Sequence, residues 1–520
     1  MLKASTNGSR TENTIRNSLF AIMSRIVIIL FNFITRIVFV RTLGDQYTGV
    51  LGLFTEILSM LAIAELGVGT AITRGLYKPI KEKDNYRIAQ YMSFIRKAYH
   101  IIAASIIVLG LLVIPFFPYI LKDIPDVKES IYLIYALYLI NSSVSYLFIY
   151  NGTLLTASQK HYLVNLVQSA ISVVKCAVNI ALLLIFRAFL LYLVIEIGCN
   201  LLQNILITNV AKKDMAEVYN YKNVELDKET KHSLFNDLRA LFYYKISGAI
   251  LKGTDSIIIS SFIGVSTVGL YSNYTLLSNQ MYYMIHQVFG SATPSIGNLS
   301  VEKKGEEQYV VYEKLMFFAF ALYCISGSVF FNCAQPLIEL AYGKTRVLSL
   351  SFLAVLSLEY YVRGMMGPVS SFRDANGLFI QGKYRPLIMA FMNIVISVLL
   401  VKPLGLVGVV LGTVLSRAIT QLWFDIYILN KLIFKRSYSE VFGQYLLYLV
   451  ISVVCTAIPL GCMSFFSINS VLLRLIVSVI LSLVVCIGLI VLLFHRSAEY
   501  RSIKRIVLGF SKKMLAKARL

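Results

Sequence analysis

Fourteen stretches of this sequence are long and apolar enough to cross a lipid bilayer, and they constrain the fold more than any other feature. Hydrocarbon offers the backbone no hydrogen-bond partner, so each stretch must satisfy its own amides as an α-helix. The predicted spans are 18–40, 47–72, 98–118, 130–151, 162–186, 188–211, 241–262, 267–295, 314–333, 346–371, 386–401, 404–430, 443–465 and 470–494. The sequence therefore predicts an all-α integral membrane protein.

The basic residues behind the net charge of +22 are divided unequally between the two sides of the membrane, which argues against a nucleic-acid-binding protein. With residues at a span's edge counted in the adjoining segment, 34 of the 49 Lys and Arg lie on the side of the N-terminus and seven on the other. By the positive-inside rule, both termini are cytoplasmic. We expect the basic tail 495–520 to lie on an anionic inner leaflet, with a partner-binding helix as the alternative.

The chain repeats itself at an offset of about 220 residues. The segment Gly44–Leu51 recurs as Gly264–Tyr271, and Gln159–Tyr162 recurs as Gln381–Tyr384. An even number of spans per half gives both halves the same orientation, so the repeat is parallel. The predicted parts are a cytoplasmic lead-in 1–17, an N-lobe 18–211, a cytoplasmic linker 212–240, a C-lobe 241–430, two further spans in 443–494 and the tail 495–520.

Cations lie deep inside several spans, where lipid exposure would be costly. Arg25, Lys175, Lys252, Arg363 and Arg417 together would cost about 12–17 kcal/mol if they faced hydrocarbon. A water-filled cavity that receives an anion avoids this cost. The cations assigned to it are Arg25, Arg36, Lys175, Lys245, Lys252, Arg363 and Arg417.

The first span carries a polar stripe that the repeat reproduces. Arg25, Asn32 and Arg36 share one helix face, and the offset of 220 maps them onto Lys245, Lys252 and Ser256. The polar positions predicted to line the cavity are Asn32, Ser256, Asn273, Gln280 and Gln287. The alternatives are interhelical hydrogen bonds for the amides, a snorkelling Arg36, and structural ion pairs of Lys252 with Asp255 and of Arg363 with Glu359.

Catalytic and metal-binding motifs are missing from the sequence. The five histidines are scattered and there is no nucleotide-binding P-loop. All seven cysteines lie within or at the edges of apolar spans without a CxxC pair, so we interpret them as small hydrophobic residues. No loop predicted on the outer side is long enough for an enzymatic domain. We therefore expect no catalytic residue, metal or cofactor.

Four segments carry a resemblance to a known family. They are VRTLGDQYTGVLGLFTEILSMLAIAELGVGTAITRGLY after span one, TDSIIISSFIGVSTVGLYSNYTLL at span seven, NGLFIQGKYRPL before span eleven and LGLVGVVLGTVLSRAIT in span twelve. Over about residues 15–430 the chain resembles the polysaccharide-biosynthesis flippases, which translocate O-antigen and capsule repeat units. They belong to the multidrug/oligosaccharidyl-lipid/polysaccharide exporter superfamily.

The resemblance implies a V-shaped transporter of two six-helix lobes that works by alternating access in the bacterial plasma membrane. Its substrate would be an undecaprenyl-pyrophosphate-linked oligosaccharide, moved from the inner to the outer leaflet for capsule, exopolysaccharide or O-antigen assembly. Polymerases and glycosyltransferases of the same pathway would be its partners, besides membrane lipid. The carboxylates that could couple transport to an ion gradient are Glu56, Glu65, Glu196, Asp255 and Asp425.

Three other functions remain open at this point. A flippase for the lipid-linked peptidoglycan precursor would share the basic cavity and the fourteen spans. A multidrug exporter of the same superfamily would favour cationic drugs, which the central cations oppose. A membrane glycosyltransferase or ligase would require longer outer loops than the sequence provides.

The charge distribution makes a topological prediction. Reporter tags inserted in 73–97, in 212–240 and after residue 496 should all be cytoplasmic, and a tag in 120–129 should be outside. Protease protection of the tags in sealed vesicles measures this. A 212–240 tag on the outer side would contradict both the span count and the parallel repeat.

Overall fold

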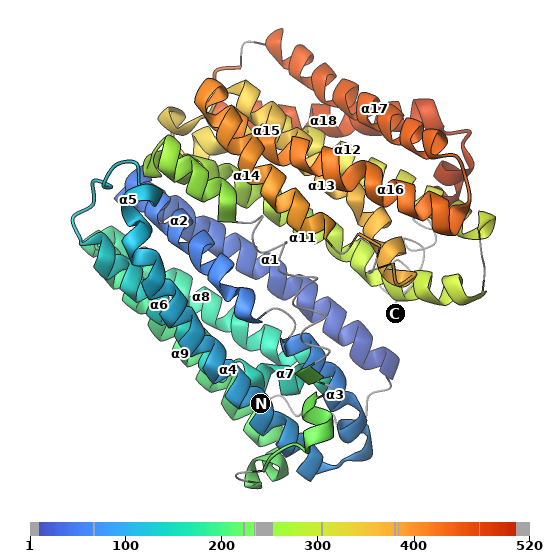
Figure 1. Ribbon diagram of the computed structural model, residues 1–520. Helices are drawn as coiled ribbons and strands as arrows, with labels where there is room; N and C mark the ends of the chain where they lie inside the picture. The colour runs from blue at the N-terminus through green and yellow to red at the C-terminus, as the bar shows by residue number, and fades with distance from the viewer. Residues whose placement is uncertain are drawn as a thin grey trace, which may run out of the picture. The chain divides into compact units, whose positions relative to one another are not determined.

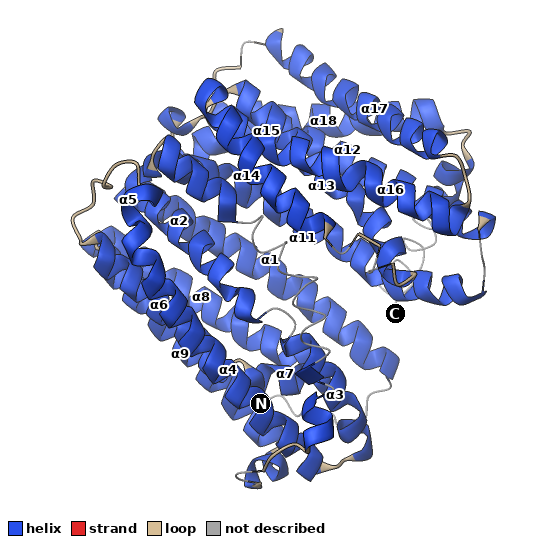
Figure 2. Ribbon diagram, viewed as in Figure 1, coloured by secondary structure: helices blue, strands red, loops and turns tan. Residues whose placement is uncertain are grey.

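The structure is a computed structural model that describes residues 10–65, 68–221, 224–232, 234–235, 253–302, 305–378, 381–382, 384–466 and 468–505. Within these ranges it contains helices and turns and no strand (Figure 2). The chain divides into two compact units, Met1–Gly269 and Leu270–Leu520 (Figure 1). The helical residues 253–262 and the start of the next helix belong to the first unit.

The first unit consists of long helices joined by short turns. Its elements are α1 (Arg10–Leu43), α2 (Asp45–Leu61), η1 (Ala62–Glu65), α3 (Val68–Glu82), α4 (Asn85–Val113), η2 (Ile114–Phe116), α5 (Phe117–Ile120), α6 (Ile131–Phe148), α7 (Tyr150–Ala157), α8 (His161–Phe186), α9 (Phe189–Asp214), η3 (Ala216–Asn220) and the helical residues 253–262. Helix α8 packs on α1 and α9, and α6 packs on α4 and α9.

The second unit is built around α12. Its elements are α11 (Val265–Glu302, shared with the first unit), α12 (Glu306–Tyr342), η4 (Lys344–Arg346), α13 (Leu350–Ala375), α14 (Arg385–Leu404), α15 (Leu406–Arg417), the π-helix η5 (Ala418–Leu422), α16 (Trp423–Leu429), the π-helix η6 (Asn430–Phe434), α17 (Tyr438–Ser464) and α18 (Val471–Phe494). Helix α12 contacts α13, α17 and α18, and α14 lies along α15.

The predicted all-α membrane fold is confirmed. Among the described residues, nine helical segments are long and apolar enough to cross a membrane. Three more predicted spans coincide with α1, α11 and α13, and the span predicted at 47–72 is divided among α2, η1 and α3. The predicted span 241–262 is described only from residue 253. Helices α11 and α13 fall outside the nine because they carry polar residues such as Asn273, Glu359 and Arg363.

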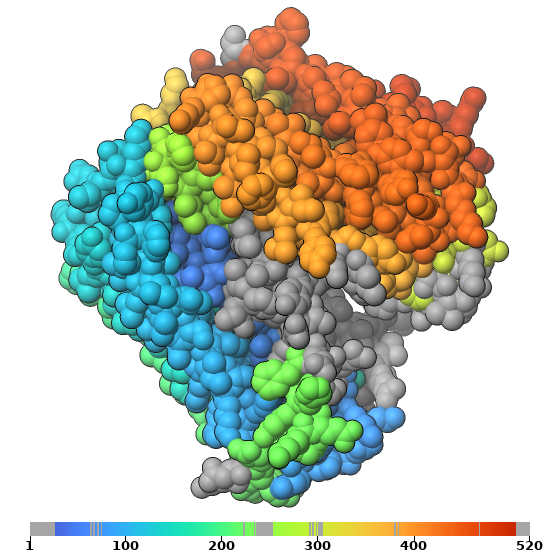
Figure 3. Space-filling view, viewed as in Figure 1, coloured from blue at the N-terminus to red at the C-terminus, as the bar shows by residue number. Residues whose placement is uncertain are grey.

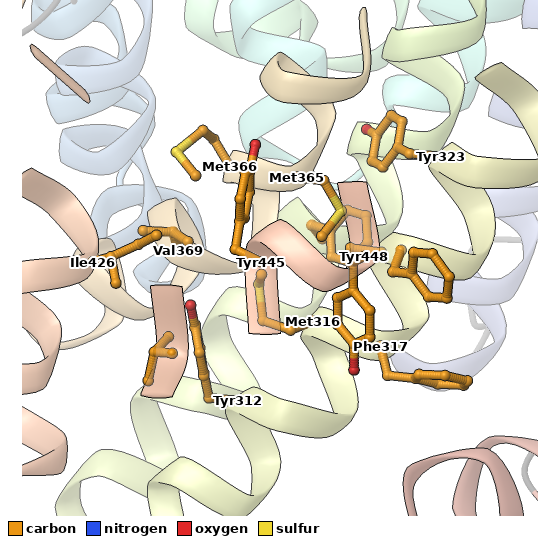
Figure 4. Close-up of a cluster of buried hydrophobic side chains, with 14 of the residues drawn as sticks. Tyr312, Met316, Phe317, Tyr323, Met365, Met366, Val369, Ile426, Tyr445 and Tyr448 are labelled. Carbon is orange, nitrogen blue, oxygen red and sulfur yellow. The ribbon is translucent and has the colours of Figure 1, made fainter. Parts of the chain in front are cut away.

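The core of the second unit is rich in aromatic and sulfur-containing side chains. Tyr312 and Met316 of α12 meet Met365 of α13 and Tyr445 of α17 in one buried cluster (Figure 4). Phe320 stacks on Tyr448 with ring centroids 4.4 Å apart. These contacts join α17, one of the two helices outside the repeat, firmly to α12.

The outer surfaces of the helices are apolar, as a lipid-facing protein requires. Residues between about 100 and 150 of the first unit form a continuous surface (cyan in Figure 3). That segment exposes large hydrophobic side chains such as Ile101, Val108 and Leu112. Patches this extensive on a water-soluble protein would cause aggregation.

Ion pairs hold part of the predicted linker against α4. Arg87 lies 2.5 Å from Asp227, and Glu225 is paired with Lys97 at 2.7 Å and with Lys231 at 3.0 Å. The hydrogen bonds from Lys97 and Lys231 lower the pKa of the Glu225 carboxyl to about 2. The segment 224–232 is therefore docked and not extended into solvent.

Two glycines related by the repeat make reciprocal backbone contacts. A Cβ atom on Gly49 would overlap the carbonyl of Val265, and one on Gly269 would lie 2.6 Å from the carbonyl oxygen of Asp45. The offset of 220 maps Gly49 onto Gly269 and Asp45 onto Val265, so each contact is the repeat image of the other. Each turn thus packs against the backbone of the other at the equivalent position.

Substitution of Gly269 tests this contact. Gly269→Ala should lower the melting temperature by several degrees, because overpacking costs about 1–3 kcal/mol. Gly290→Ala in the same helix is the control, since no neighbouring atom lies within 4 Å of the added Cβ. Because alanine favours helix over glycine by about 1 kcal/mol, the control should be neutral or stabilising. Equal melting temperatures for both variants would contradict the close approach.

Candidate functional site

A large cavity with several polar side chains in its wall lies within the first unit. It has a volume of about 940 Å³ and is bounded by residues of η1, α3, α4, α6, α7, α8 and α9. Four amide side chains, Gln168, Asn200, Gln203 and Asn204, contribute to its wall. Amides and hydroxyls without a central cation suit a neutral polar ligand such as a sugar.

One carboxylate faces this cavity. Among the described residues that line it, Glu65 is the one with an acidic side chain. The hydroxyls of Tyr99 and Tyr146 approach this carboxylate. Glu65 is one of the carboxylates that the sequence proposes for ion coupling, and its position gives it access to water.

A second predicted carboxylate is fully engaged by its neighbours. Glu196 Oε2 lies 2.9 Å from Lys175 Nζ, and Asn179 donates to Glu196 Oε1 at 3.1 Å. Arg36 is buried in α1, and Arg36 and Glu196 both lie close enough to Tyr192 to act on its hydroxyl electrostatically. Lys175 is thus neutralised by a partner one helix away, which favours a structural role over direct anion binding.

Two of the predicted cations meet in the second unit and share one carboxylate. Arg363 Nε of α13 and Arg417 Nη2 of α15 lie 3.4 and 3.5 Å from the same oxygen, Glu359 Oε1. Arg363 Nη1 donates to Asn279 at 2.9 Å, and Arg417 Nη1 donates to Gln421 at 3.1 Å. We refer to Arg363, Arg417 and Glu359 as the two-arginine cluster. Its formal charge is +1.

The two-arginine cluster has donors to spare. Within the described part of the chain, the buried atoms Arg363 Nε, Arg363 Nη2 and Arg417 Nε have no hydrogen-bond partner. The side chains are 19% exposed for Arg363 and 15% for Arg417, so part of each side chain lies at the surface of the unit. Unsatisfied buried guanidinium groups are costly, and an anion with several oxygens would satisfy them.

A second pair of arginines, which sequence reasoning missed, surrounds Asp425. Arg373 Nη1 lies 2.5 Å from Asp425 Oδ1, and Arg385 pairs with the other oxygen. Arg373 also donates to the carbonyl oxygens of Leu378 and Gln381, at 2.9 and 3.1 Å. Asp425 therefore holds the turn between α13 and α14, which favours a structural role over ion coupling. The signal available in the sequence was the repeat anchor Gln381–Tyr384 beside these arginines.

The remaining predicted residues occupy several environments. Asn273 is buried, Gln280 is half-buried and Gln287 is exposed, so the stripe on α11 does not line one uniform surface. Ser256 and Asp255 are buried, and Asn32 is exposed on α1. Glu56 and Asp255 both have partners. Lys245 and Lys252 lie outside the described residues, as does the side chain of Arg25.

Three cysteines come together where the C-terminal helices meet α12. The Sγ atoms of Cys324, Cys455 and Cys486 lie within 4.8 Å of one another, and all three residues are buried. Of the residues that the structure describes, these form the one group of three or more close enough to hold a metal ion. All seven cysteines are free thiols, and their interpretation as small packing residues stays a prediction.

No family model matches the chain, and no curated protein matches it either. Several solved structures do. A multidrug resistance MATE family transporter of the MOP superfamily, inward-facing, matches with a TM-score of 0.61 and 15% identity over 78% of this chain and 98% of the other. Lipid II flippase MurJ, in an inward closed conformation, matches with a TM-score of 0.60 and 15% identity over 92% of this chain and 99% of the other. A mutant of the Vibrio cholerae MATE transporter VcmN matches with a TM-score of 0.56 and 15% identity over 81% of this chain and 99% of the other.

The chain has the exporter fold that these proteins share. At 15% identity the similarity concerns the fold alone. The match to MurJ leaves out about 8% of this chain, or about 42 residues, which is fewer than the span from Tyr438 to Phe494. That match therefore includes at least part of the segment formed by α17 and α18, the two helices outside the repeat.

Thiol labelling tests the cavity of the first unit. In a background without native cysteines, Gln168→Cys and Asn204→Cys should react with a membrane-impermeant thiol reagent, because both side chains line the cavity. The matched control is Val174→Cys on the same helix as Gln168. Val174 is 51% exposed on the protein surface, but that surface would face lipid, so it should stay unlabelled. Protection of both cavity positions would mean that water does not enter.

Proposed function

We propose that this protein is a flippase that moves a polyprenyl-diphosphate-linked oligosaccharide across the plasma membrane by alternating access. The observation that carries the proposal is the two-arginine cluster, in which Arg363 and Arg417 share Glu359 and keep buried N–H groups without partners. A diphosphate supplies negative charge and several acceptor oxygens, which match planar guanidinium donors.

Features of each unit, taken by itself, suit the other parts of such a substrate. The polar cavity of the first unit, with its four amide side chains, suits sugar hydroxyl groups. A polyprenyl chain is as apolar as lipid and can remain in the bilayer during transport. The substrate class is therefore an amphiphile with an anionic junction between sugar and lipid, of the kind used for capsule, exopolysaccharide or O-antigen repeat units.

Glu65 is the strongest candidate for ion coupling among the five proposed carboxylates. Glu196 and Asp425 are each paired with described cations, and Glu56 and Asp255 also have partners. Glu65 instead faces the cavity beside tyrosine hydroxyls. We propose that it binds and releases the coupling ion as the cavity opens to either side.

Two alternatives have an observation in their favour. The long match to MurJ, whose printed name is lipid II flippase, favours a peptidoglycan precursor as the substrate. The acidic Glu65 in the cavity favours a multidrug exporter of cationic compounds. Three assays separate them: restored surface polysaccharide in a deletion strain, restored growth in a strain depleted of its lipid II flippase, and reduced drug accumulation.

Neutral arginine variants test the anion site. Arg363→Gln and Arg417→Gln should each reduce transport about ten- to a hundredfold, since a hydrogen bond to a charged group contributes about 1.5–3 kcal/mol. Surface polysaccharide per molecule of inserted protein is the measurement. Arg474→Gln is the control, because Arg474 pairs with Glu339 away from the cluster. Undiminished transport by both cluster variants would refute the anion site.

A further inference from the structure

The two-arginine cluster holds a charge balance that a bound diphosphate would disturb. With Glu359 ionised its formal charge is +1, whereas a diphosphate diester carries −2. Adding the ligand to the cluster as it stands would leave a net −1 in a largely buried site, next to a carboxylate that repels it. Removing the charge of Glu359 would leave two guanidinium groups and two phosphate charges, which sum to zero.

Glu359 is held more loosely than Asp425 and Glu339, two other carboxylates of the second unit that pair with arginines. Its contacts with Arg363 and Arg417 measure 3.4 and 3.5 Å, beyond the range of a normal hydrogen bond. By contrast, Arg373 reaches Asp425 at 2.5 Å and Arg474 reaches Glu339 at 2.5 Å. The carboxylate of Glu359 thus balances the charge of the two arginines without forming normal hydrogen bonds to their N–H groups.

Both arginines are positioned by neutral groups and do not depend on Glu359 for their orientation. Arg363 donates to Asn279 and lies over the ring of Tyr282, with its Cζ 4.2 Å from the ring centroid. Arg417 is fixed by Gln421. These contacts would persist if Glu359 became neutral, so the guanidinium groups would remain ready to bind an anion.

We propose that Glu359 is an internal counter-ion that occupies the anion site between transport cycles and takes up one proton when the diphosphate binds. This inference rests on the proposed function and adds a regulatory step to the same site. One proton moves from water to the Glu359 carboxylate as the ligand enters, and it returns to water when the ligand leaves. Diphosphate binding is thereby linked to proton uptake.

Among the other titratable groups near the cluster, one could take up the proton in place of Glu359. Those that face the two arginines from the packed helices are Tyr271, Tyr282, Tyr283, His286, Tyr323, Tyr360 and Tyr445. Tyrosines titrate near pH 10 and stay neutral at physiological pH. His286 is the remaining one of these groups, and histidine is the residue type whose ordinary pKa lies nearest neutral pH, so it requires a control variant.

The experiment uses purified full-length protein and UDP-glucose, a soluble diphosphate diester with constant charge between about pH 6 and 8. Trp423, the sole tryptophan, lies six residues after Arg417 and reports binding by fluorescence. Calorimetry in two buffers of different ionisation heat counts the protons. Wild-type protein should take up close to one proton per ligand, and its affinity should fall about tenfold for each pH unit of increase.

Glu359→Gln should take up no proton and bind at least tenfold more tightly at pH 8. Three control variants should behave as wild type: Glu359→Asp, His286→Asn and Glu339→Gln. Glu339 serves as a control because its carboxylate pairs with a different arginine, Arg474. If Glu359→Gln does not fold, the pH dependence of UDP-glucose affinity in the wild-type and Glu359→Asp proteins tests the counter-ion role instead. Unchanged proton uptake in Glu359→Gln, or pH-independent wild-type binding, would overturn the counter-ion role alone. Failure of wild-type protein to bind UDP-glucose in preference to uridine would overturn the anion site and the proposed function together.

Discussion

A charge inside a membrane protein must find a partner, water or a ligand, and this requirement organises both units. Three buried or half-buried carboxylates answer it in a similar way, because each lies beside two donor side chains. Glu196 accepts from Lys175 and Asn179, and Asp425 from Arg373 and Arg385. Glu359 balances Arg363 and Arg417 at longer distances. The first two bind helices together through short contacts, and the third leaves three buried guanidinium N–H groups of its two arginines without a partner, which favours binding an anion.

Much of the fold was predictable because membrane spans follow from local composition. A window of about twenty apolar residues must be helical wherever it lies in the chain, so the helices match the predicted spans closely. The repeat was also visible, since the glycines of the two turns need no partner to be recognised. What the sequence could not supply was their contact: only the packed chain reveals that Gly49 and Gly269 lie against each other's turn. Long-range packing also groups residues 253–269 with the first unit, which hydropathy alone does not indicate.

The site was predictable in its residue types and not in its pairings. Arg363 and Arg417 were recognisable by their depth, but 54 positions separate them and no periodicity connects α13 to α15. Arg373 and Arg385 lie near helix ends, where a cation costs little free energy because it can reach the membrane surface. The sequence therefore did not predict that they are buried around Asp425. The cavity around Glu65 is formed by seven elements whose individual residues are unremarkable polar side chains. Partners across helices depend on packing, which hydropathy does not encode.

The π-helical turn Ala418–Leu422 has a geometric consequence for the second unit. Residues eight apart on a regular α-helix are rotated by about 80°, whereas the extra residue of a π-turn sets the helix back by about 100°. Arg417 and Asp425 consequently lie within about 20° of each other around the helix axis. Gln421 stands between them, accepting from Arg417 and lying within reach of Asp425. Loss of a single residue in this turn would leave an intact helix of nearly the same length, yet it would turn Asp425 away from its arginines. The orientation of Asp425 therefore depends on the phase of the helix as well as on its composition.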